Sequence, residues 1–159
     1  MMREVFVQSM QEHGGSVVNM TADFRNGMPG MGHSGAARAG MSNLTMSAAF
    51  EWAQAGVRVN AVAPGWVASS GMDSYGGAVK AMIPKLREHV PLRRLATEAE
   101  ISAAIVFLLS PGAAFITGVT LQIDGAASLG SPVFPTMEHE SSVAFEGFHR
   151  AQTPEALQP

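Results

Sequence analysis

The segment Gly32-His33-Ser34-Gly35-Ala36 places a histidine and a serine on a glycine-flanked stretch, where a nucleophilic hydroxyl would be accessible. Asp124 follows, and then His139 or His149, in the chain order that one class of serine hydrolases uses for its catalytic groups. That class needs its serine on a sharp turn directly after a strand, with a glycine two residues beyond it. Here the preceding β-branched run ends near Met20, and position 36 is alanine. We therefore expect these groups to serve another chemistry.

The glycine-rich stretch at residues 27–32 (Gly-Met-Pro-Gly-Met-Gly) is a second candidate, because such loops can cradle phosphates. A dinucleotide-binding loop directly follows a strand, and an acidic residue then ends the next strand. The acidic residue at about the required distance is Glu51, which falls inside an expected helix. The stretch is therefore predicted to be a flexible loop.

The histidines do not form a recognisable metal-binding pattern. None of the five is four residues from another, and no pair of carboxylates completes a set of ligands. The chain has no cysteine, which excludes a thiolate zinc site, a cysteine nucleophile and a disulfide scaffold together. We expect no bound metal.

Composition narrows the class of protein. The 159 residues are 47% hydrophobic and 14% charged, which suits one domain with a sizeable core. No apolar run approaches a membrane span and residues 1–15 lack a signal-peptide core, so we expect a cytoplasmic protein without membrane association. The net charge of −3 gives no electrostatic case for nucleic acid. This charge and four prolines fall in residues 131–159, which predicts a compact body at 1–130 followed by an irregular tail.

The elements that must position these groups alternate between helix and strand. Residues 1–13 have apolar side chains at helical spacing and stop at Gly14, and residues 16–20 form a short β-branched run. A long helix is expected over 34–55, ended by Gly56. Its predicted buried stripe consists of Ala37, Met41, Leu44 and Ala48.

The second part of the chain continues the alternation. Residues 57–63 are apolar on both faces, as expected of a central parallel strand. A long excursion over 66–96 has a helical piece around 78–90. Thr97-Glu98-Ala99-Glu100 is a capping box that begins another helix, and residues 119–123 alternate as a strand. This order predicts an α/β fold with a parallel sheet and helices on both faces.

Four segments carry a family resemblance when they are taken together. They are residues 14–19 (Gly-Gly-Ser-Val-Val-Asn), 33–40 (His-Ser-Gly-Ala-Ala-Arg-Ala-Gly), 57–65 (ending in Pro-Gly) and 118–125 (ending in Ile-Asp-Gly). In this combination, residues 1–130 resemble the C-terminal half of the short-chain dehydrogenase/reductase family. The resemblance implies the second half of a doubly wound, Rossmann-like fold. It also implies hydride transfer with NADP or NAD as the cofactor, with NADP slightly favoured.

The positions that carry catalysis in this family are changed here. Aligned through Ala39-Gly40, the tyrosine position of the family's Tyr-x-x-x-Lys holds Ser34, and the lysine position holds Arg38. The family's serine position holds Ala22, beside Thr21. A serine hydroxyl is too weak an acid to replace the phenol. Arg38 keeps a fixed positive charge and is expected to hold ribose hydroxyls.

The string at 33–40 resembles one branch of the family, the peroxisomal trans-2-enoyl-CoA and 2,4-dienoyl-CoA reductases, which also lack Tyr-x-x-x-Lys at this place. These enzymes reduce carbon–carbon double bonds of acyl-CoA thioesters. Hydride attack at the β-carbon builds charge on the thioester oxygen, so a hydrogen-bond donor there matters more than a strong acid. Ser34, His33 or Thr21 is expected to supply that donor. The alternative is that Ser34 only caps its helix.

Cofactor and substrate residues follow from the same resemblance. The segment that matches the family's Pro-Gly-x-Val-x-Thr consists of Pro64, Gly65, Val67 and Ser69. The match implies that the Val67 backbone binds the nicotinamide carboxamide and that Ser69 approaches the cofactor's amide or phosphates. Residues 70–96 match the family's variable substrate loop. The side chains expected to line an acyl channel there are Met72, Tyr75, Met82, Ile83 and Leu86.

We therefore expect an NAD(P)-dependent oxidoreductase that reduces an enoyl thioester of the acyl-CoA type. Two alternatives stay open: a dehydrogenase of another apolar substrate, such as a terpenoid alcohol, and a non-catalytic chain kept for association. The family's helices that resemble 1–13 and 34–55 pack against their copies, which implies a dimer or tetramer and exposed Phe6, Phe50 and Trp52. The family's glycine-rich cofactor turn is not among these residues. The chain is therefore expected to be incomplete and inactive alone.

Overall fold

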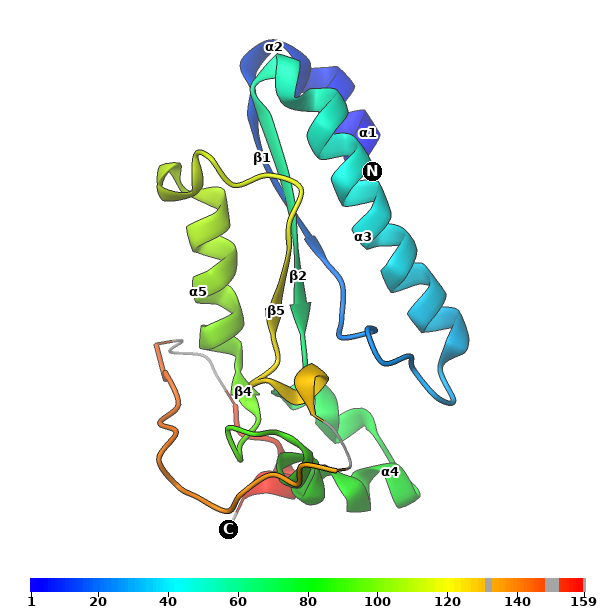
Figure 1. Ribbon diagram of the computed structural model, residues 1–159, viewed down its shortest axis with the longest axis vertical. Coiled ribbons are helices and arrows are strands. Elements are labelled where there is room, and N and C mark those ends of the chain that lie inside the picture. Colours follow the sequence, from blue (N-terminus) through cyan, green and yellow to red (C-terminus); the bar gives the residue numbers. More distant parts are fainter. Residues whose placement is uncertain (131–132, 148–151, 159) are drawn as a thin grey trace. The chain divides into compact units, whose positions relative to one another are not determined.

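The computed structural model describes residues 1–130, 133–147 and 152–158, so His149 lies outside the described residues. The chain forms two compact units. The first unit comprises Met1–Ala63 and Ala104–Gln122, and the second comprises Pro64–Ala103 and the described part of Ile123–Pro159. The fold is α/β with a parallel sheet, as predicted, and Figure 1 follows the chain through its elements.

The first unit opens with a helix that runs from α1 (Met2–Val5) through a π-helical turn (Phe6–Met10) into α2 (Gln11–His13). Gly14 ends it with φ 68°, a positive value that glycine adopts without strain. Phe6 stacks on Trp52 with ring centroids 4.2 Å apart. The predicted helix and its glycine end are thus confirmed, and Phe6 and Trp52 are half-buried against each other instead of exposed.

The sheet of this unit has the order β1-β2-β5, with β1 at Gly15–Met20, β2 at Val57–Pro64 and β5 at Thr120–Ile123. β1 and β2 are parallel, with Gly15 opposite Val57 and Met20 opposite Val62. Among the described residues, β1 has no strand on its outer side. β2 is the central strand: its Val59, Ala61, Val62 and Ala63 are 0% exposed, which confirms the expected burial on both faces.

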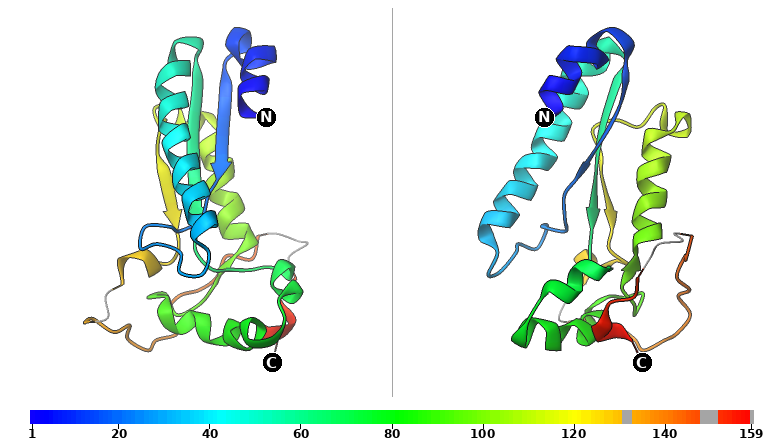
Figure 2. Two further views of the ribbon diagram at one scale, coloured as in Figure 1. Left: turned by 90° about the vertical axis from the view of Figure 1, so that its right-hand side faces the viewer. Right: turned by 180° about the vertical axis from the view of Figure 1, so that it is seen from behind.

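Two helices cover the faces of this sheet (Figures 1 and 2). α3 (Gly32–Trp52) lies on one face, continues as a 3₁₀ turn to Ala55 and ends at Gly56. The C-terminal half of α5 (Glu98–Leu109) lies on the other face. Arg58 of β2 donates to the carbonyls of Leu108 (2.8 Å) and Ser110 (3.1 Å) at the end of α5, and to that of Ile116 (3.3 Å) in the loop beyond it.

The predicted buried stripe of α3 is confirmed at Ala48 and wrong at Ala37 and Leu44. Ala37 is exposed and Leu44 is 48% exposed, whereas the buried residues are Ser42, Thr45, Ala48 and Ala49. The buried face uses hydroxyls because they pair with polar groups of the sheet. Thr45 Oγ1 accepts from Asn19 Nδ2 (2.9 Å) and donates to the Met41 carbonyl (2.9 Å). Such paired hydroxyls are tolerated inside a protein, although an apolar-stripe pattern does not reveal them.

The second unit is built on short elements. A two-stranded parallel sheet joins β3 (Val67–Ala68) to β4 (Ala96–Thr97). Between them lie a 3₁₀ turn (Ser70–Ser74), α4 (Gly77–Met82) and a second 3₁₀ helix (Ile83–His89), so the helical piece expected around residues 78–90 is present. Its change from α to 3₁₀ geometry coincides with a proline in the first turn of the second helix.

The predicted capping box at the start of α5 is confirmed. Thr97 Oγ1 accepts from the Glu100 backbone N–H (3.3 Å), and Glu100 Oε2 accepts from the Thr97 backbone N–H (2.9 Å).

In the described parts of the tail, residues 133–147 and 152–158, the one helical segment is a 3₁₀ turn at Glu155–Leu157. The expected domain boundary at residue 130 stays a prediction. Among the described residues, none of the helices combines the length and the apolar character that crossing a membrane requires.

Candidate active site

Thr21 lies where β1 ends and is 3% exposed. Its backbone N–H and its Oγ1 both donate to the carbonyl of Val62, at 2.8 and 2.9 Å. The hydroxyl therefore joins the end of β1 to β2, and its single proton is already engaged there. Thr21 can still accept a hydrogen bond. Of the three predicted donors, Ser34, His33 and Thr21, it is the one whose proton is already bound to another group of the protein.

Arg38, on the second turn of α3, reaches back to the same place. Its Nη1 donates to the carbonyl of Met20, the last residue of β1, at 3.2 Å. This contact sets a guanidinium at the carboxyl end of a parallel strand, the edge at which open α/β sheets bind ligands. The remaining guanidinium donors are suited to ribose hydroxyls, the role expected of Arg38.

Ser34 and His33 lie in the first turn of α3. The helix begins at Gly32, its N-cap is Met31, and no side chain caps it. The alternative that Ser34 caps the helix is therefore wrong. Within the described part of the chain, neither side chain has a hydrogen-bond partner. Ser34 is half-buried, and it lies one turn before Arg38 on the same helix face, whereas His33 is exposed.

The segment predicted to face the cofactor begins where β2 ends at Pro64. Gly65 donates its N–H to the Ile123 carbonyl (3.0 Å), and a Cβ at Gly65 would lie 2.9 Å from Cα of Asp124. Only glycine fits this close approach of two backbones. The Trp66 carbonyl accepts from Ala96 N–H (2.9 Å), and Val67 then pairs with Ala96 in the small sheet. The segment is thus fixed by its own backbone, and its contacts with a cofactor stay a prediction.

Asp124 reinforces this turn. Its Oδ1 accepts from the Ala126 N–H (2.9 Å), and its Oδ2 accepts from the Ser128 N–H (3.0 Å). Partial burial by itself raises the pKa of Asp124, but the hydrogen bonds from Ser128 and Ala126 outweigh it and hold the pKa below its ordinary value. Asp124 is therefore an ionised structural group whose oxygens are occupied.

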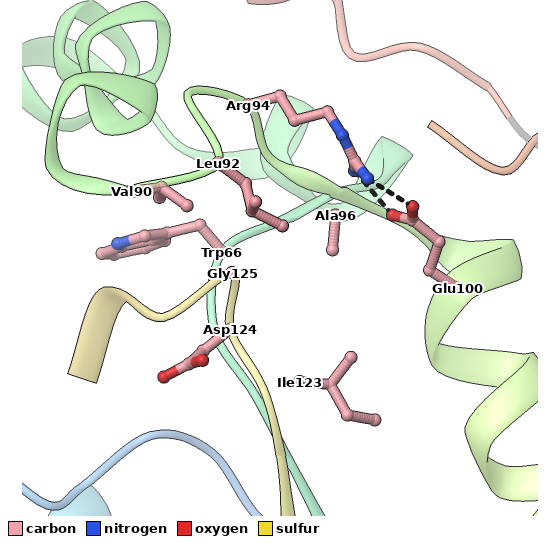
Figure 3. Close-up of a pocket in the computed structure, with 9 residues that line it drawn as sticks. All are labelled: Trp66, Val90, Leu92, Arg94, Ala96, Glu100, Ile123, Asp124 and Gly125. Atoms are coloured by element: carbon pink, nitrogen blue, oxygen red, sulfur yellow. Dashed lines mark hydrogen bonds and ion pairs between the residues drawn. The ribbon is translucent and has the colours of Figure 1, made fainter. Parts of the chain in front are cut away.

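A cavity of about 200 Å³ lies beside this segment, and Figure 3 shows its walls. Val90, Leu92 and Trp66 form an apolar part, and Arg94 and Glu100 bind each other through two bonds of 2.6 and 2.8 Å. All the charged groups of the cavity thus have partners within the protein. The cavity lies beside the Pro64–Gly65 turn, and none of its charged side chains is free to act as a catalytic group.

The expected substrate residues separate into two groups. Met72 is 6% exposed and packs with Ile83 and Leu95 in the small core of the second unit. Tyr75 and Met82 are 52% and 57% exposed, so they are available to a ligand. The acyl channel itself stays a prediction.

Sequence reasoning did not identify Arg94. Its partner Glu100 has a local signal, the capping box, but nothing in the spacing of Arg94 indicates that it would bind that carboxylate. In the described part of the chain, no three His, Asp and Glu side chains come together as a potential metal site.

Comparison with known proteins gives the family context. A family model described as Enoyl-(Acyl carrier protein) reductase matches residues 1–128. The peroxisomal 2,4-dienoyl-CoA reductase of Pongo abelii is 35% identical over 132 residues, which are 82% of this chain and 45% of that protein. A 3-oxoacyl-(acyl-carrier-protein) reductase of Staphylococcus epidermidis is 33% identical over 124 residues, 77% of this chain and 50% of that one.

Among solved structures, a citronellol catabolism dehydrogenase of Pseudomonas aeruginosa PAO1 is 64% identical with a TM-score of 0.68. The match covers 80% of this chain and 48% of that one. Acetoin dehydrogenase from Enterobacter cloacae is 29% identical with a TM-score of 0.69, over 83% of this chain and 51% of that one. The chain thus spans about half the length of the relatives it matches.

Proposed function

The chain belongs to the short-chain dehydrogenase/reductase family of oxidoreductases, and we propose that it forms part of an enzyme that reduces the carbon–carbon double bond of an enoyl thioester. The substrate would be acyl-CoA-like and the cofactor NADPH or NADH. Similarity to a dienoyl-CoA reductase supports this choice, and the observation that carries it is the chemistry at the tyrosine position of the family, which Ser34 occupies.

Ser34 suits this reaction better than it suits alcohol chemistry. Oxidising an alcohol requires a group that takes up the hydroxyl proton, and a serine is too weakly acidic to cycle that proton near neutral pH. Reducing an enoyl thioester requires a donor at the oxygen on which negative charge builds. The half-buried Ser34 hydroxyl has no partner among the described residues, so it is available as that donor.

Residues of each unit match positions that hold a nicotinamide cofactor in the family. Arg38 presents its guanidinium at the carboxyl end of β1, where it would hold ribose hydroxyls. The backbone of Val67 and the hydroxyl of Ser69 would bind the carboxamide end. When bound, the cofactor supplies the hydride. Arg38 would hold the ribose, and Ser34 would stabilise the negative charge on the substrate oxygen, while a proton from water completes the reduction at the α-carbon.

A second candidate function is the oxidation of an apolar alcohol. The observation that favours it is the 64% identity to a solved dehydrogenase of citronellol catabolism. This candidate predicts activity on citronellol, whereas the enoyl reductase predicts none.

A chimera tests the two candidates. The first half of the Pseudomonas aeruginosa dehydrogenase is joined to this chain, which covers 48% of that protein, and cofactor absorbance is followed with two substrates. We expect NADPH to be consumed with crotonyl-CoA and no reduction of NAD or NADP with citronellol. The opposite result favours the alcohol dehydrogenase, and activity with neither substrate contradicts both.

Variants of the same chimera test the role of Ser34. Ser34→Ala removes the proposed donor and is expected to lower kcat on crotonyl-CoA about 100-fold. Ser34→Thr keeps a hydroxyl and is expected to retain most activity. His33→Ala serves as the matched control in the same turn, and a greater loss for that variant would assign the donor to His33.

A further inference from the structure

The substrate-loop segment of the second unit has little core of its own. Its buried apolar residues are Met72, Ile83, Leu95 and Val90, of which the first three pack together. This small core is completed from the far end of the chain, because Ala156 and Leu157 pack against the same three side chains. Pro154, just before them, is fully buried. The turn at residues 154–157 is therefore an integral part of the substrate-loop core, although the family match ends at residue 128.

Polar contacts fix the same turn to two different pieces of the loop. The Glu155 backbone N–H donates to Asp73 Oδ1 (2.8 Å), in the 3₁₀ turn Ser70–Ser74. The Glu155 carboxylate binds Lys80 Nζ (2.8 Å), on α4. Figure 2 shows this red turn against the green helical pieces. The turn thus connects two pieces that the chain itself joins only through the exposed residues 75–76.

A second part of the tail, residues 133–147, contacts residues 94–100, where the loop ends and α5 begins. Arg94 Nε donates to Ser142 Oγ (2.9 Å), and Thr97 Oγ1 donates to the Phe145 carbonyl (2.7 Å). The Phe145 N–H donates to Glu100 Oε1 (3.2 Å). The tail therefore contacts both the loop pieces and the strand β4 that ends the loop.

We propose that the turn at residues 154–157 determines substrate specificity by fixing the position of Tyr75 and Met82. Tyr75 directly follows the piece that Asp73 anchors, and Met82 ends the helix that Lys80 anchors. Both side chains are more than half exposed, and they are among the five predicted to line an acyl channel. With the turn in place, an acyl chain long enough to contact both side chains gains from their fixed positions, and a short one does not. This proposal rests on the proposed function for the identity of the substrate.

The test compares Leu157→Ala with Val143→Ala. Leu157 packs in the loop core, whereas Val143 is a tail residue whose side chain is 85% exposed, so it is a matched control. Hydrogen exchange is first measured on the 159-residue chain. We expect amides of residues 70–89 to exchange about tenfold faster in Leu157→Ala and unchanged in Val143→Ala and in the conservative Leu157→Met. Unchanged exchange in Leu157→Ala would overturn the proposal.

The second measurement uses the chimera with a short and a long substrate, crotonyl-CoA and dodecenoyl-CoA. Leu157→Ala is expected to raise KM for the long substrate about tenfold, with kcat and the KM for the short substrate within about twofold. Equal effects on both substrates would mean a merely structural role and would overturn the specificity claim. If the chimera oxidises alcohols instead, the proposed function fails, and the same comparison between a short and a long alcohol decides the role of the turn.

Discussion

Replacing Glu100 with glutamine is expected to destabilise the second unit in a way that depends on pH. Glu100 accepts two bonds from Arg94 and one each from the backbone N–H groups of Thr97 and Phe145. Its side chain is 19% exposed and that of Arg94 is 24% exposed, so both charges are largely shielded from water. Glutamine keeps the size of the side chain and removes its charge. Hydrogen bonds to charged groups contribute about 1.5–3 kcal/mol, and partial exposure reduces the expected loss to about 1–2 kcal/mol.

The direction of the pH effect follows from the pKa of Glu100. Partial burial alone raises this pKa, but the bonds from Arg94, Thr97 and Phe145 together outweigh burial and leave the pKa below its ordinary value near 4.5. A carboxyl with a lowered folded-state pKa contributes stability above its ordinary pKa, and this contribution is lost as pH falls through the folded value. Protonated glutamate resembles glutamine, so the difference between the two proteins should then disappear.

The assay is urea unfolding of both proteins, followed by tryptophan fluorescence, because Trp66 lines the same cavity as Glu100. We expect a difference in the free energy of unfolding of about 1–2 kcal/mol at about pH 7 and a much smaller one at about pH 3. Glu98→Gln is the control, since Glu98 lies in the same helical turn and has no side-chain partner among the described residues. A difference that stays constant, or grows, as pH falls would refute the reasoning.

Gly65→Ala is expected to cost about 1–3 kcal/mol by urea unfolding, because the new Cβ meets Asp124, whereas Gly76→Ala, which meets nothing, should cost far less. Arg58→Met removes the side-chain donor from the carbonyls of Leu109 and Ser110, while those of Leu108 and Ile116 keep Ser16 and Asn60, and should lower the midpoint of urea unfolding. Phe50 is 88% exposed, and we propose that its surface mediates self-association. Light scattering should give a mass above 16.7 kDa that Phe50→Glu reduces to that of a monomer. The 159-residue chain alone should show no NADPH binding by calorimetry, and saturable binding would contradict this.

The parts of the fold that the sequence predicts are those set by local chemistry. Gly14 and Gly56 end helices because each adopts a positive φ, and Thr97 with Glu100 forms a reciprocal cap within four residues. Residues 57–63 are apolar on both faces because β2 is covered on both faces, which is a property of one segment alone. Such signals need no knowledge of the rest of the molecule.

The missed features depend on contacts between distant residues. The burial of Thr45 in α3 follows from its bond with Asn19, 26 residues away, and the stripe pattern does not contain that information. Pairing of β3 with β4 joins segments about 30 residues apart, and each has two residues, too few for a periodic pattern. Arg94 and the turn at residues 154–157 belong to the same class, since their partners lie far along the chain.

Motifs of this chain that match the family pattern and positions that differ from it give different information about its function. Gly65 and Asp124 match the family, but the structure gives each a mechanical reason: two backbones approach too closely for a side chain, and a carboxylate caps the following turn. Both residues stabilise the fold whether or not a cofactor binds. Their presence is therefore stronger evidence for the fold than for the enzymatic activity. Ser34 has no such constraint, because it neither caps α3 nor bonds to another described residue. Because packing and capping place no demand on Ser34, the residue type at this position is set by the reaction, in which Ser34 and Arg38, one turn later, have the proposed roles.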